Sequence, residues 1–131
     1  VLKINPTVIS ILKAQPNIYF LGAKEYSHTP SYLMNFDLCI IPYLKSITVA
    51  TPTKIFDYLA TGLPVVSTPF PGSGLFQGLI YTASTPSEFI SMIKKALTER
   101  DINLSKKRID MALMNTWAKR AEEIMGVVRQ R

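Results

Sequence analysis

Four short apolar runs separate the helical segments of this chain, and they constrain its fold more than any other feature. Each run is continuous rather than alternating in polarity, which is the pattern of strands buried on both faces of a sheet. Because such runs alternate with helical segments, the sequence predicts a three-layer α/β domain with a mostly parallel sheet. The predicted strands are Ile18 to Leu21, Leu38 to Ile41, Val65 to Ser67 and Leu79 to Thr82.

A capping residue followed by proline marks the start of four predicted helices. Proline fits the first helical position because the N–H that it lacks would have no helical partner there. Thr85 and Glu88 also form a capping box. The four pairs are Asn5-Pro6, Thr29-Pro30, Thr51-Pro52 and Thr85-Pro86.

These signals predict helices over about 6–14, 31–36 and 51–61 and a fourth that begins at Pro86. Ser105 is the expected cap of a further helix that runs through Met114, and a last helix begins near Trp117. Residues from about 104 to 131 therefore form a helical end to a single domain that spans residues 1–131. Apolar residues at helical spacing give the last helix one stripe, formed by Trp117, Ala121, Ile124 and Val128.

The composition fits one folded domain of the cytoplasm. The 131 residues are 47% hydrophobic and 18% charged, which excludes wholesale disorder. No apolar run approaches the roughly 18 residues of a membrane span, and the start lacks the pattern of a signal peptide. A single cysteine, Cys39, excludes an intrachain disulfide and fits a reducing compartment. Its position within a strand predicts a small buried hydrophobe.

The net charge is +6, and basic residues crowd the last quarter of the chain. A solvated helical face is one explanation, and contact with an anionic membrane surface is another. No zinc-ligand spacing, aromatic RNA-binding signature or recognition helix supports a nucleic-acid partner. The basic residues are Lys106, Lys107, Arg108, Lys119, Arg120, Arg129 and Arg131.

The run from Thr51 to Ser67 predicts a loop, a helix, a tight turn and a buried strand. Thr51 is the expected N-cap, and Gly62 suits the left-handed residue that ends a helix. A helix start presents free backbone N–H groups and partial positive charge. Lys54, in the first turn, opposes that dipole, and a bound anion would remove the conflict. The run therefore indicates an anion site, with an ordinary capped helix and an exposed lysine as the alternative.

Four motifs in order along the chain resemble GT-B glycosyltransferases of the group 1, family-4-like branch. The run from 51 to 67 is similar to that family's nucleotide-sugar-binding motif, P-x-K-[LIF]-[FY]-E-Y-L-A-x-G-x-P-V-V. The resemblance covers roughly residues 17 to 120 and implies the C-terminal, donor-binding domain, which has a Rossmann-like fold. The other motifs are Asn17 to Gly22, Pro30 to Leu33 with Asp37 to Pro42, and Asn115 to Trp117.

The resemblance implies contacts with the diphosphate and the ribose of a donor. The Lys54 ammonium, the Thr51 hydroxyl and the backbone N–H groups of Thr53 and Lys54 are the candidates for the diphosphate. Asp57 stands where the family has a glutamate that hydrogen-bonds ribose hydroxyls, although aspartate is one methylene shorter. Because Lys54 and Asp57 are three residues apart, one helix face holds both, and a weak surface ion pair is the alternative.

The base and the sugar have expected positions as well. The loop after Gly22, from Ala23 to Tyr26, is the implied base site, where Tyr26 packs either on the base or on the domain surface. The loop after the second strand, with Tyr43, is expected to line the donor sugar. Val49 occupies the position of a glutamate that retaining members often carry, which leaves the stereochemical outcome open.

The implied activity is transfer of a hexose-type sugar from a nucleoside diphosphate sugar to a hydroxyl acceptor, in cell-surface polysaccharide or glycolipid synthesis. Lys54 and the helix N–H groups would stabilise the leaving diphosphate, a scheme that requires no metal or other cofactor. A flavodoxin-type or response-regulator-type module is a weaker alternative, because its acidic cluster or phosphate loop is missing. A non-catalytic relative that keeps the fold as an interaction domain is the other alternative.

Compared with the family, the chain begins abruptly. Val1 to Ile4 resembles the tail of a strand, and the first strands and the N-terminal domain are missing from this sequence. In a 3-2-1-4 strand order the missing first strand would lie between Ile18–Leu21 and Leu38–Ile41. We therefore expect an open sheet edge that permits self-association, and no activity from this chain alone.

Overall fold

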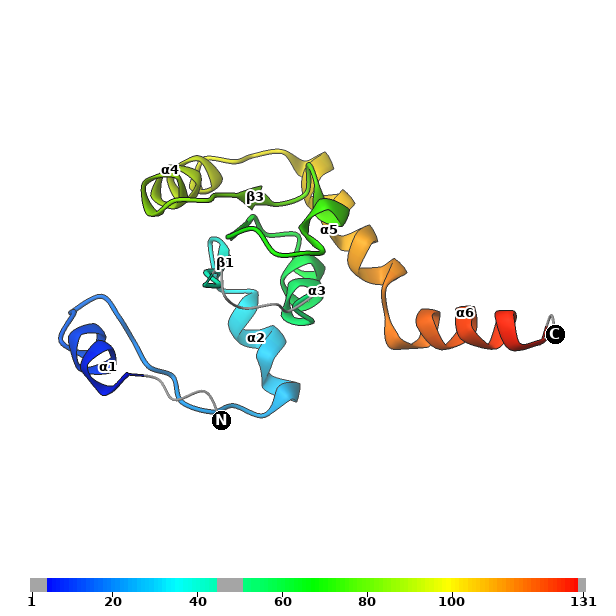
Figure 1. Ribbon diagram of the computed structural model, residues 1–131, viewed down its shortest axis with the longest axis horizontal. Helices are drawn as coiled ribbons and strands as arrows, with labels where there is room; N and C mark the ends of the chain where they lie inside the picture. Colours follow the sequence, from blue (N-terminus) through cyan, green and yellow to red (C-terminus); the bar gives the residue numbers. More distant parts are fainter. Residues whose placement is uncertain (1–4, 45–50, 130–131) are drawn as a thin grey trace.

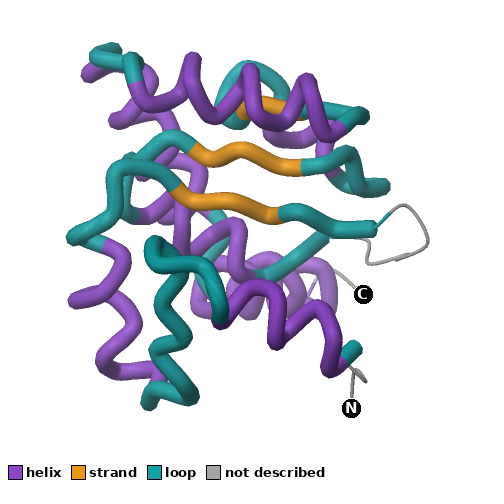
Figure 2. The backbone as a smooth tube through the Cα atoms, turned by 90° about the vertical axis from the view of Figure 1, so that its left-hand side faces the viewer, coloured by secondary structure: helices purple, strands orange, loops and turns teal. Residues whose placement is uncertain are grey.

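The computed structural model describes residues 5–44 and 51–129 and places three short parallel strands at its centre. The strands are β1 (Cys39–Ile41), β2 (Val65–Ser67) and β3 (Tyr81–Thr82), and their order in the sheet is β1-β2-β3. Cys39 lies opposite Val65, and Val66 lies opposite Tyr81. Figure 2 shows the strands side by side with helices around them. The parallel sheet confirms the predicted α/β, Rossmann-like class.

Helices cover both faces of the sheet. One face carries the main core, in which Ile41 and Val65 pack with Ile55 and Leu59 of α3 (Lys54–Ala60) and with Ala112 of α5 (Ile102–Met114). On β2, the side chain of Val66 points to the sheet face opposite that of Val65 and Ser67. The helix α4 (Pro86–Leu97) packs against β2 and β3. The helices α1 (Pro6–Lys13), α2 (Thr29–Leu33) and α6 (Trp117–Arg129) complete the set, with α1 and α6 projecting from the central body in Figure 1.

Two of the four predicted helix starts are confirmed. The Asn5 side chain accepts a hydrogen bond from the Thr7 backbone N–H at 2.9 Å, with Pro6 in the first helical position of α1. The Thr85 side chain accepts a hydrogen bond from the Glu88 backbone N–H, and the Glu88 carboxylate accepts one from the Thr85 backbone N–H. The predicted capping box of α4 is therefore complete. Both caps use an extended backbone at the capping residue, as the physical rule requires.

The other predicted caps are wrong in position. Thr29 is already helical and follows the 3₁₀ turn η1 (Tyr26–His28), so α2 begins earlier than the proline signal indicated. Thr51 does not cap α3, because the Ile55 N–H bonds to the Pro52 carbonyl and forms a tight turn ahead of the helix. Thr53 occupies the cap position of α3 with a helical backbone and makes no side-chain bond.

The start of α5 also differs from the prediction. Asp101, not Ser105, is its N-cap, and the Asp101 carboxylate accepts hydrogen bonds from the Asn103 and Leu104 backbone N–H groups. Ser105 lies inside the helix against Gly62. An aspartate followed by an apolar residue is a sufficient cap signal, and the sequence interpretation passed over it.

Two predicted strands are changed. Ile18 to Leu21 is not a strand, because no described strand lies next to it to complete a ladder, and its side chains are largely exposed. The last strand is shorter than predicted, since the Leu79 and Ile80 N–H groups both bond to the Phe76 carbonyl in a turn. Phe76 itself ends the turn η2 (Ser73–Phe76) and is fully buried.

Arg108 is not part of a solvated basic face, contrary to the sequence interpretation. Its guanidinium is fully buried and pairs with Glu99, with Nη2 at 2.8 Å from Oε2. It also donates to the backbone carbonyls of Leu79 and Gly62, and the Tyr81 hydroxyl donates to Glu99 at 2.7 Å. This network joins α5 to the end of α4 and to the turns before β2 and β3.

Gly62 follows α3 with φ of 74°, as predicted for a left-handed terminating residue. A Cβ at this position would lie 2.3 Å from Ser105 Oγ, so the glycine also allows α5 to approach the turn. Two predictions concern residues outside the described part of the chain: the strand tail at 1–4 and the sugar-lining loop beyond residue 44, with Val49.

Candidate functional site

A pocket of about 750 Å³ lies between α3 and the junction of α5 with α6. Thr53, Phe56, Asp57 and Ala60 form one wall, and their spacing of three, four and seven residues places them on one face of α3. Because α3 connects two parallel strands, it runs opposite to them and starts at their carboxyl ends. Thr53 therefore borders the pocket at the edge where open α/β sheets bind ligands.

Asp57 is the only carboxylate among the described residues that line this pocket. The Tyr26 hydroxyl, from η1, donates a hydrogen bond to Asp57 Oδ1 at 2.8 Å. That bond to the carboxylate raises the pKa of Tyr26, because removing the phenol proton would break it. Asp57 Oδ2 has no hydrogen-bond partner within the described ranges, so it can accept one from a ligand hydroxyl.

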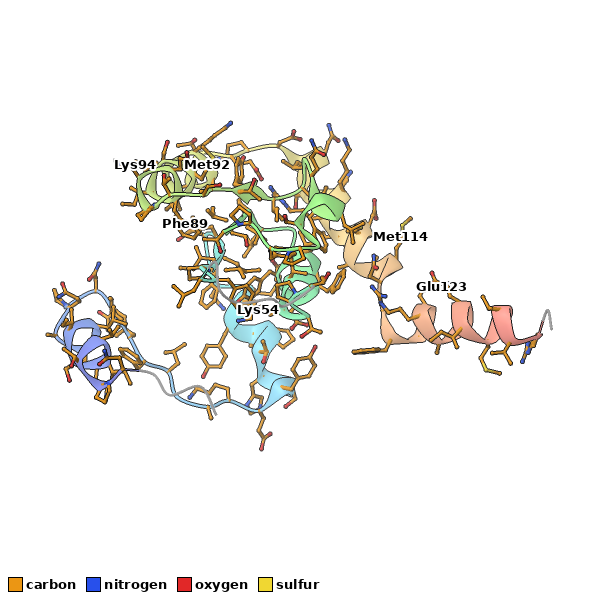
Figure 3. The ribbon with its side chains drawn as sticks, in the orientation of Figure 1. Lys54, Phe89, Met92, Lys94, Met114 and Glu123 are labelled. Carbon is orange, nitrogen blue, oxygen red and sulfur yellow. The ribbon has the colours of Figure 1, made fainter. Side chains whose placement is uncertain are left out.

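Four of the predicted contact residues, Tyr26, Thr51, Thr53 and Asp57, line the pocket together. Lys54, labelled in Figure 3, does not. Its ammonium lies 5.4 Å from the centre of the Tyr43 ring, beside the chain that leaves β1. No ion pair joins Lys54 to Asp57 in the part of the chain described here. Lys54 therefore contacts the Tyr43 ring and not Asp57, and the surface ion pair that was the alternative is not formed.

Gly22 and His28 lie outside the pocket lining. Gly22 has φ of 71°, and a Cβ there would meet no atom within 4 Å. The glycine thus serves a left-handed turn in an exposed loop. His28 ends η1 and makes no capping bond to α2.

The second wall of the pocket was not foreseen from the sequence. It comes from the α5–α6 junction, which we define as residues 115–120, together with the last turn of α5. The Arg120 guanidinium lies 5.8 Å from the centre of the Phe56 ring, and its Nη2 donates to Asn115 Oδ1 at 3.0 Å. Trp117 is 81% exposed. The sequence showed an exposed basic helix, but no local pattern indicated that its first turn faces α3.

The remaining candidate chemistry is structural. Cys39 is buried, and burial raises its pKa to about 11, so the thiol stays protonated and unreactive at neutral pH. Across residues 5–44 and 51–129, no group of three or more His, Cys, Asp or Glu side chains is placed to hold a metal ion. None of the described helices has the length and apolar character needed to cross a bilayer.

The fold and the pocket define a Rossmann-like α/β domain with a pocket at the carboxyl edge of its sheet, where open α/β sheets bind ligands. The family model described as Glycosyl transferases group 1 matches residues 5–99, so the chain belongs to this family of glycosyltransferases. The matched region includes β1, α3, β2, β3 and α4 but ends before α5.

A protein of Bacillus subtilis (strain 168), named as the teichuronic acid biosynthesis glycosyltransferase TuaH, is 29% identical over 109 residues. The match covers 78% of this chain but 28% of the relative, so the chain spans little more than a quarter of that protein's length. No solved structure matches the chain.

Proposed function

We propose that this chain is the donor-binding domain of a glycosyltransferase that transfers a sugar from a nucleoside diphosphate sugar to a hydroxyl acceptor. The observation that carries the proposal is the pocket along α3, at the carboxyl edge of the sheet, in a chain that belongs to a glycosyltransferase family. Its volume lies within the range of about 300–1,000 Å³ that small-ligand sites occupy.

Asp57 is proposed to bind the ribose. Its free Oδ2 accepts a hydrogen bond from a ribose hydroxyl, while the bond from Tyr26 to Oδ1 fixes the carboxylate. Tyr26 therefore acts through Asp57 and does not need to stack on the base, which was one of its two predicted roles. The shorter reach of aspartate is compatible with this arrangement, because Asp57 lies on the pocket wall itself.

Lys54 is proposed to stabilise the diphosphate as it leaves. Its ammonium rests over Tyr43, at the exit from β1 where the donor sugar is expected. A lysine on a flexible four-carbon chain can move from that ring to a phosphate oxygen as negative charge develops there. Thr51 and Thr53, which precede α3, supply hydroxyl and backbone donors nearby. This scheme uses no cofactor besides the donor.

The proposed pathway and location follow the relative. Its name places it in teichuronic acid biosynthesis, so we propose synthesis of a cell-surface polysaccharide or glycolipid for the full-length protein. We further propose that the protein acts in the cytoplasm, peripherally on the inner face of the membrane. The exposed basic residues of α5 and α6 support contact with anionic lipid. A second domain would complete the active site opposite the pocket.

Titration of the full-length protein with nucleoside diphosphates tests the proposal against a non-catalytic role. A donor-binding domain should bind at least one of UDP, GDP, ADP and dTDP, whereas an interaction domain that only keeps the fold should bind none. Asp57→Ala should weaken nucleoside diphosphate binding more than binding of inorganic pyrophosphate, which has no ribose. Asp110→Ala is the matched control, because Asp110 is exposed on α5 and does not line the pocket. Equal losses for both ligands would refute the ribose contact.

A further inference from the structure

The α5–α6 junction forms a pocket wall that lies outside the family match, and the sequence motif at Asn115 to Trp117 gave it no role in the site. Residues 115–120 lie beyond the matched region, which ends at residue 99. Yet Asn115, Trp117 and Arg120 line the same pocket as Asp57. The inference drawn from this wall rests on the proposed function and identifies which part of the donor the wall contacts.

Arg120 is held in place on this wall. Its guanidinium packs on the Phe56 ring at 5.8 Å from the ring centre and donates through Nη2 to Asn115 Oδ1 at 3.0 Å. The Asn115 amide is fixed in turn, because its Nδ2 donates to the Met111 carbonyl at 2.8 Å. A guanidinium oriented in this way loses little rotational freedom when it binds a ligand.

The charge of Arg120 has no carboxylate partner within the described ranges. The ion pairs there are Arg108 with Glu99 and Lys119 with Glu122. Arg120 is also the only lysine or arginine among the described residues that line the pocket, since Lys54 faces Tyr43. Its remaining N–H donors can therefore serve an anionic ligand, for which guanidinium geometry is well suited.

The pocket thus offers two complementary polar groups and an aromatic surface. Asp57 accepts hydrogen bonds from hydroxyl groups, and Arg120 donates to anionic oxygens. Trp117 lies three residues before Arg120 on α6, so the two side chains share a helix face. Its exposed indole can stack on a flat ring, an interaction that every nucleobase can make. A nucleoside diphosphate carries hydroxyls, phosphate oxygens and a flat ring within one molecule.

We propose that the α5–α6 junction is the nucleotide-facing wall of the donor pocket, where Arg120 binds a phosphate oxygen and Trp117 stacks on the base. Stacking is tolerant of base identity, so this wall contributes affinity rather than base selectivity. The assignment moves the base contact from the loop Ala23 to Tyr26, where the family resemblance implied it, to the first turn of α6.

Binding of nucleoside diphosphates and of their nucleosides to the full-length protein, measured by calorimetry, tests the role of Arg120. Arg120→Gln should raise the Kd for the diphosphate about tenfold or more, the scale of a lost charge-assisted hydrogen bond. The Kd for the nucleoside should not change. Arg120→Lys should restore part of the loss. Arg129→Gln is the matched control, since Arg129 lies on the same helix, exposed and outside the pocket.

Trp117 should show a different pattern. Trp117→Leu should weaken the diphosphate and the nucleoside by the same factor, about fivefold or more for the loss of one stacking contact. Trp117→Phe should retain most of the affinity. Both variants should fold, because the side chain is 81% exposed.

The outcomes separate this inference from the proposed function. If Asp57→Ala weakens nucleotide binding while Arg120→Gln and Trp117→Leu do not, the junction has no role and the donor site stands without it. Equal losses in Arg120→Gln and Arg129→Gln would show a diffuse charge effect and overturn the phosphate contact. If the unaltered protein binds no nucleoside diphosphate, the proposed function fails, and this inference fails with it.

Discussion

Asp57 and Lys54 lie less than one turn apart on α3, yet their side chains contact different groups. Each residue turns the helix by about 100°, so the pocket face formed by Thr53, Phe56 and Asp57 leaves Lys54 at its margin. The Tyr26 hydroxyl holds Asp57, and the Tyr43 ring holds Lys54. In the proposed function, one short helix thereby contacts two parts of an extended donor, the ribose through Asp57 and the leaving phosphate through Lys54.

Replacing Lys54 tests its proposed contact with the leaving diphosphate. Lys54→Ala in the full-length protein should lower kcat/KM by about 10²-fold, the scale of losing one charge contact to the transition state. The loss should fall mainly on kcat, because the charge on the diphosphate grows as the glycosidic bond breaks. Lys107→Ala, on the exposed surface of α5, is the control. An effect on kcat/KM no larger than that of the control would exclude the role.

The Glu99–Arg108 pair predicts both a stability loss and a pH dependence. Glu99→Ala should destabilise the fold by about 3–5 kcal/mol, because it leaves the Arg108 guanidinium buried without a counter-charge. The bonds from Arg108 hold the pKa of Glu99 below its ordinary value of 4.5. The stabilisation is therefore present above that value and is lost as the pH falls through the lowered pKa.

Urea unfolding between about pH 7 and about pH 3 measures this dependence. The midpoint of the unaltered protein should fall toward the acid end, and that of Glu99→Gln should fall less, because glutamine does not titrate. Identical pH profiles for the two proteins would show that Glu99 is not the group responsible.

At the scale of elements, the contact between α3 and α5 decides where the pocket lies. Gly62 ends α3 in a left-handed conformation and leaves room for Ser105 of α5. From this contact α5 runs back along α3, so that Ala112 joins the core and the α5–α6 junction reaches Phe56. A change at Gly62 should therefore affect both stability and the shape of the pocket.

Gly62→Ala should destabilise the protein by at least about 1–2 kcal/mol, the cost of a left-handed backbone for a residue with a Cβ. The new methyl would also lie 2.3 Å from Ser105 Oγ and 3.2 Å from Ile109 Cδ1. In a Ser105→Ala background the penalty should shrink but not vanish, because the backbone strain and the Ile109 contact remain. Thermal unfolding of the four proteins in this double-mutant cycle gives the coupling, and a coupling of zero would refute the proposed contact.

Elements with a local signal were predictable from the sequence, and elements that depend on distant partners were not. The capping box before α4 and the apolar run of β2 appear as predicted, because their causes lie within a few residues. Ile18 to Leu21 has the composition of a strand, but strand formation requires a neighbour, and the described chain supplies none. The pairing of Arg108 with Glu99 and the approach of Arg120 to Phe56 are tertiary contacts that no sequence spacing indicates.

The helix α6 keeps its apolar stripe largely exposed. Ile124 is 64% exposed and Val128 is 61% exposed. If this surface contacts lipid, the full-length protein should sediment with anionic vesicles more than with neutral ones, and added salt should reverse the preference. Replacing Lys106, Lys107 and Arg129 together by glutamine should remove the difference. Equal sedimentation with both vesicle types would show that these basic residues form a solvated face and do not contact lipid.

At the scale of the whole molecule, the described part of the pocket offers groups for the proposed donor but no base that could activate an acceptor. Its carboxylate, Asp57, is engaged by Tyr26 and assigned to the ribose, and no histidine lines it within the described part of the chain. A hydroxyl acceptor needs a base that removes the hydroxyl proton as its oxygen attacks the anomeric carbon of the sugar and the diphosphate leaves. The chain also spans 28% of the relative's length, which leaves ample sequence in such a protein for a second domain.

The 131-residue chain alone should therefore bind nucleotides but transfer no sugar. Binding needs only the pocket between α3 and the α5–α6 junction, all of which lies within this chain. Transfer needs an acceptor site and a base positioned opposite the pocket, which we assign to the second domain. Assays with radiolabelled nucleoside diphosphate sugars and simple acceptors should give background counts for the isolated chain and turnover for the full-length protein. Turnover by the isolated chain, abolished by Lys54→Ala, would show that one domain contains the complete active site.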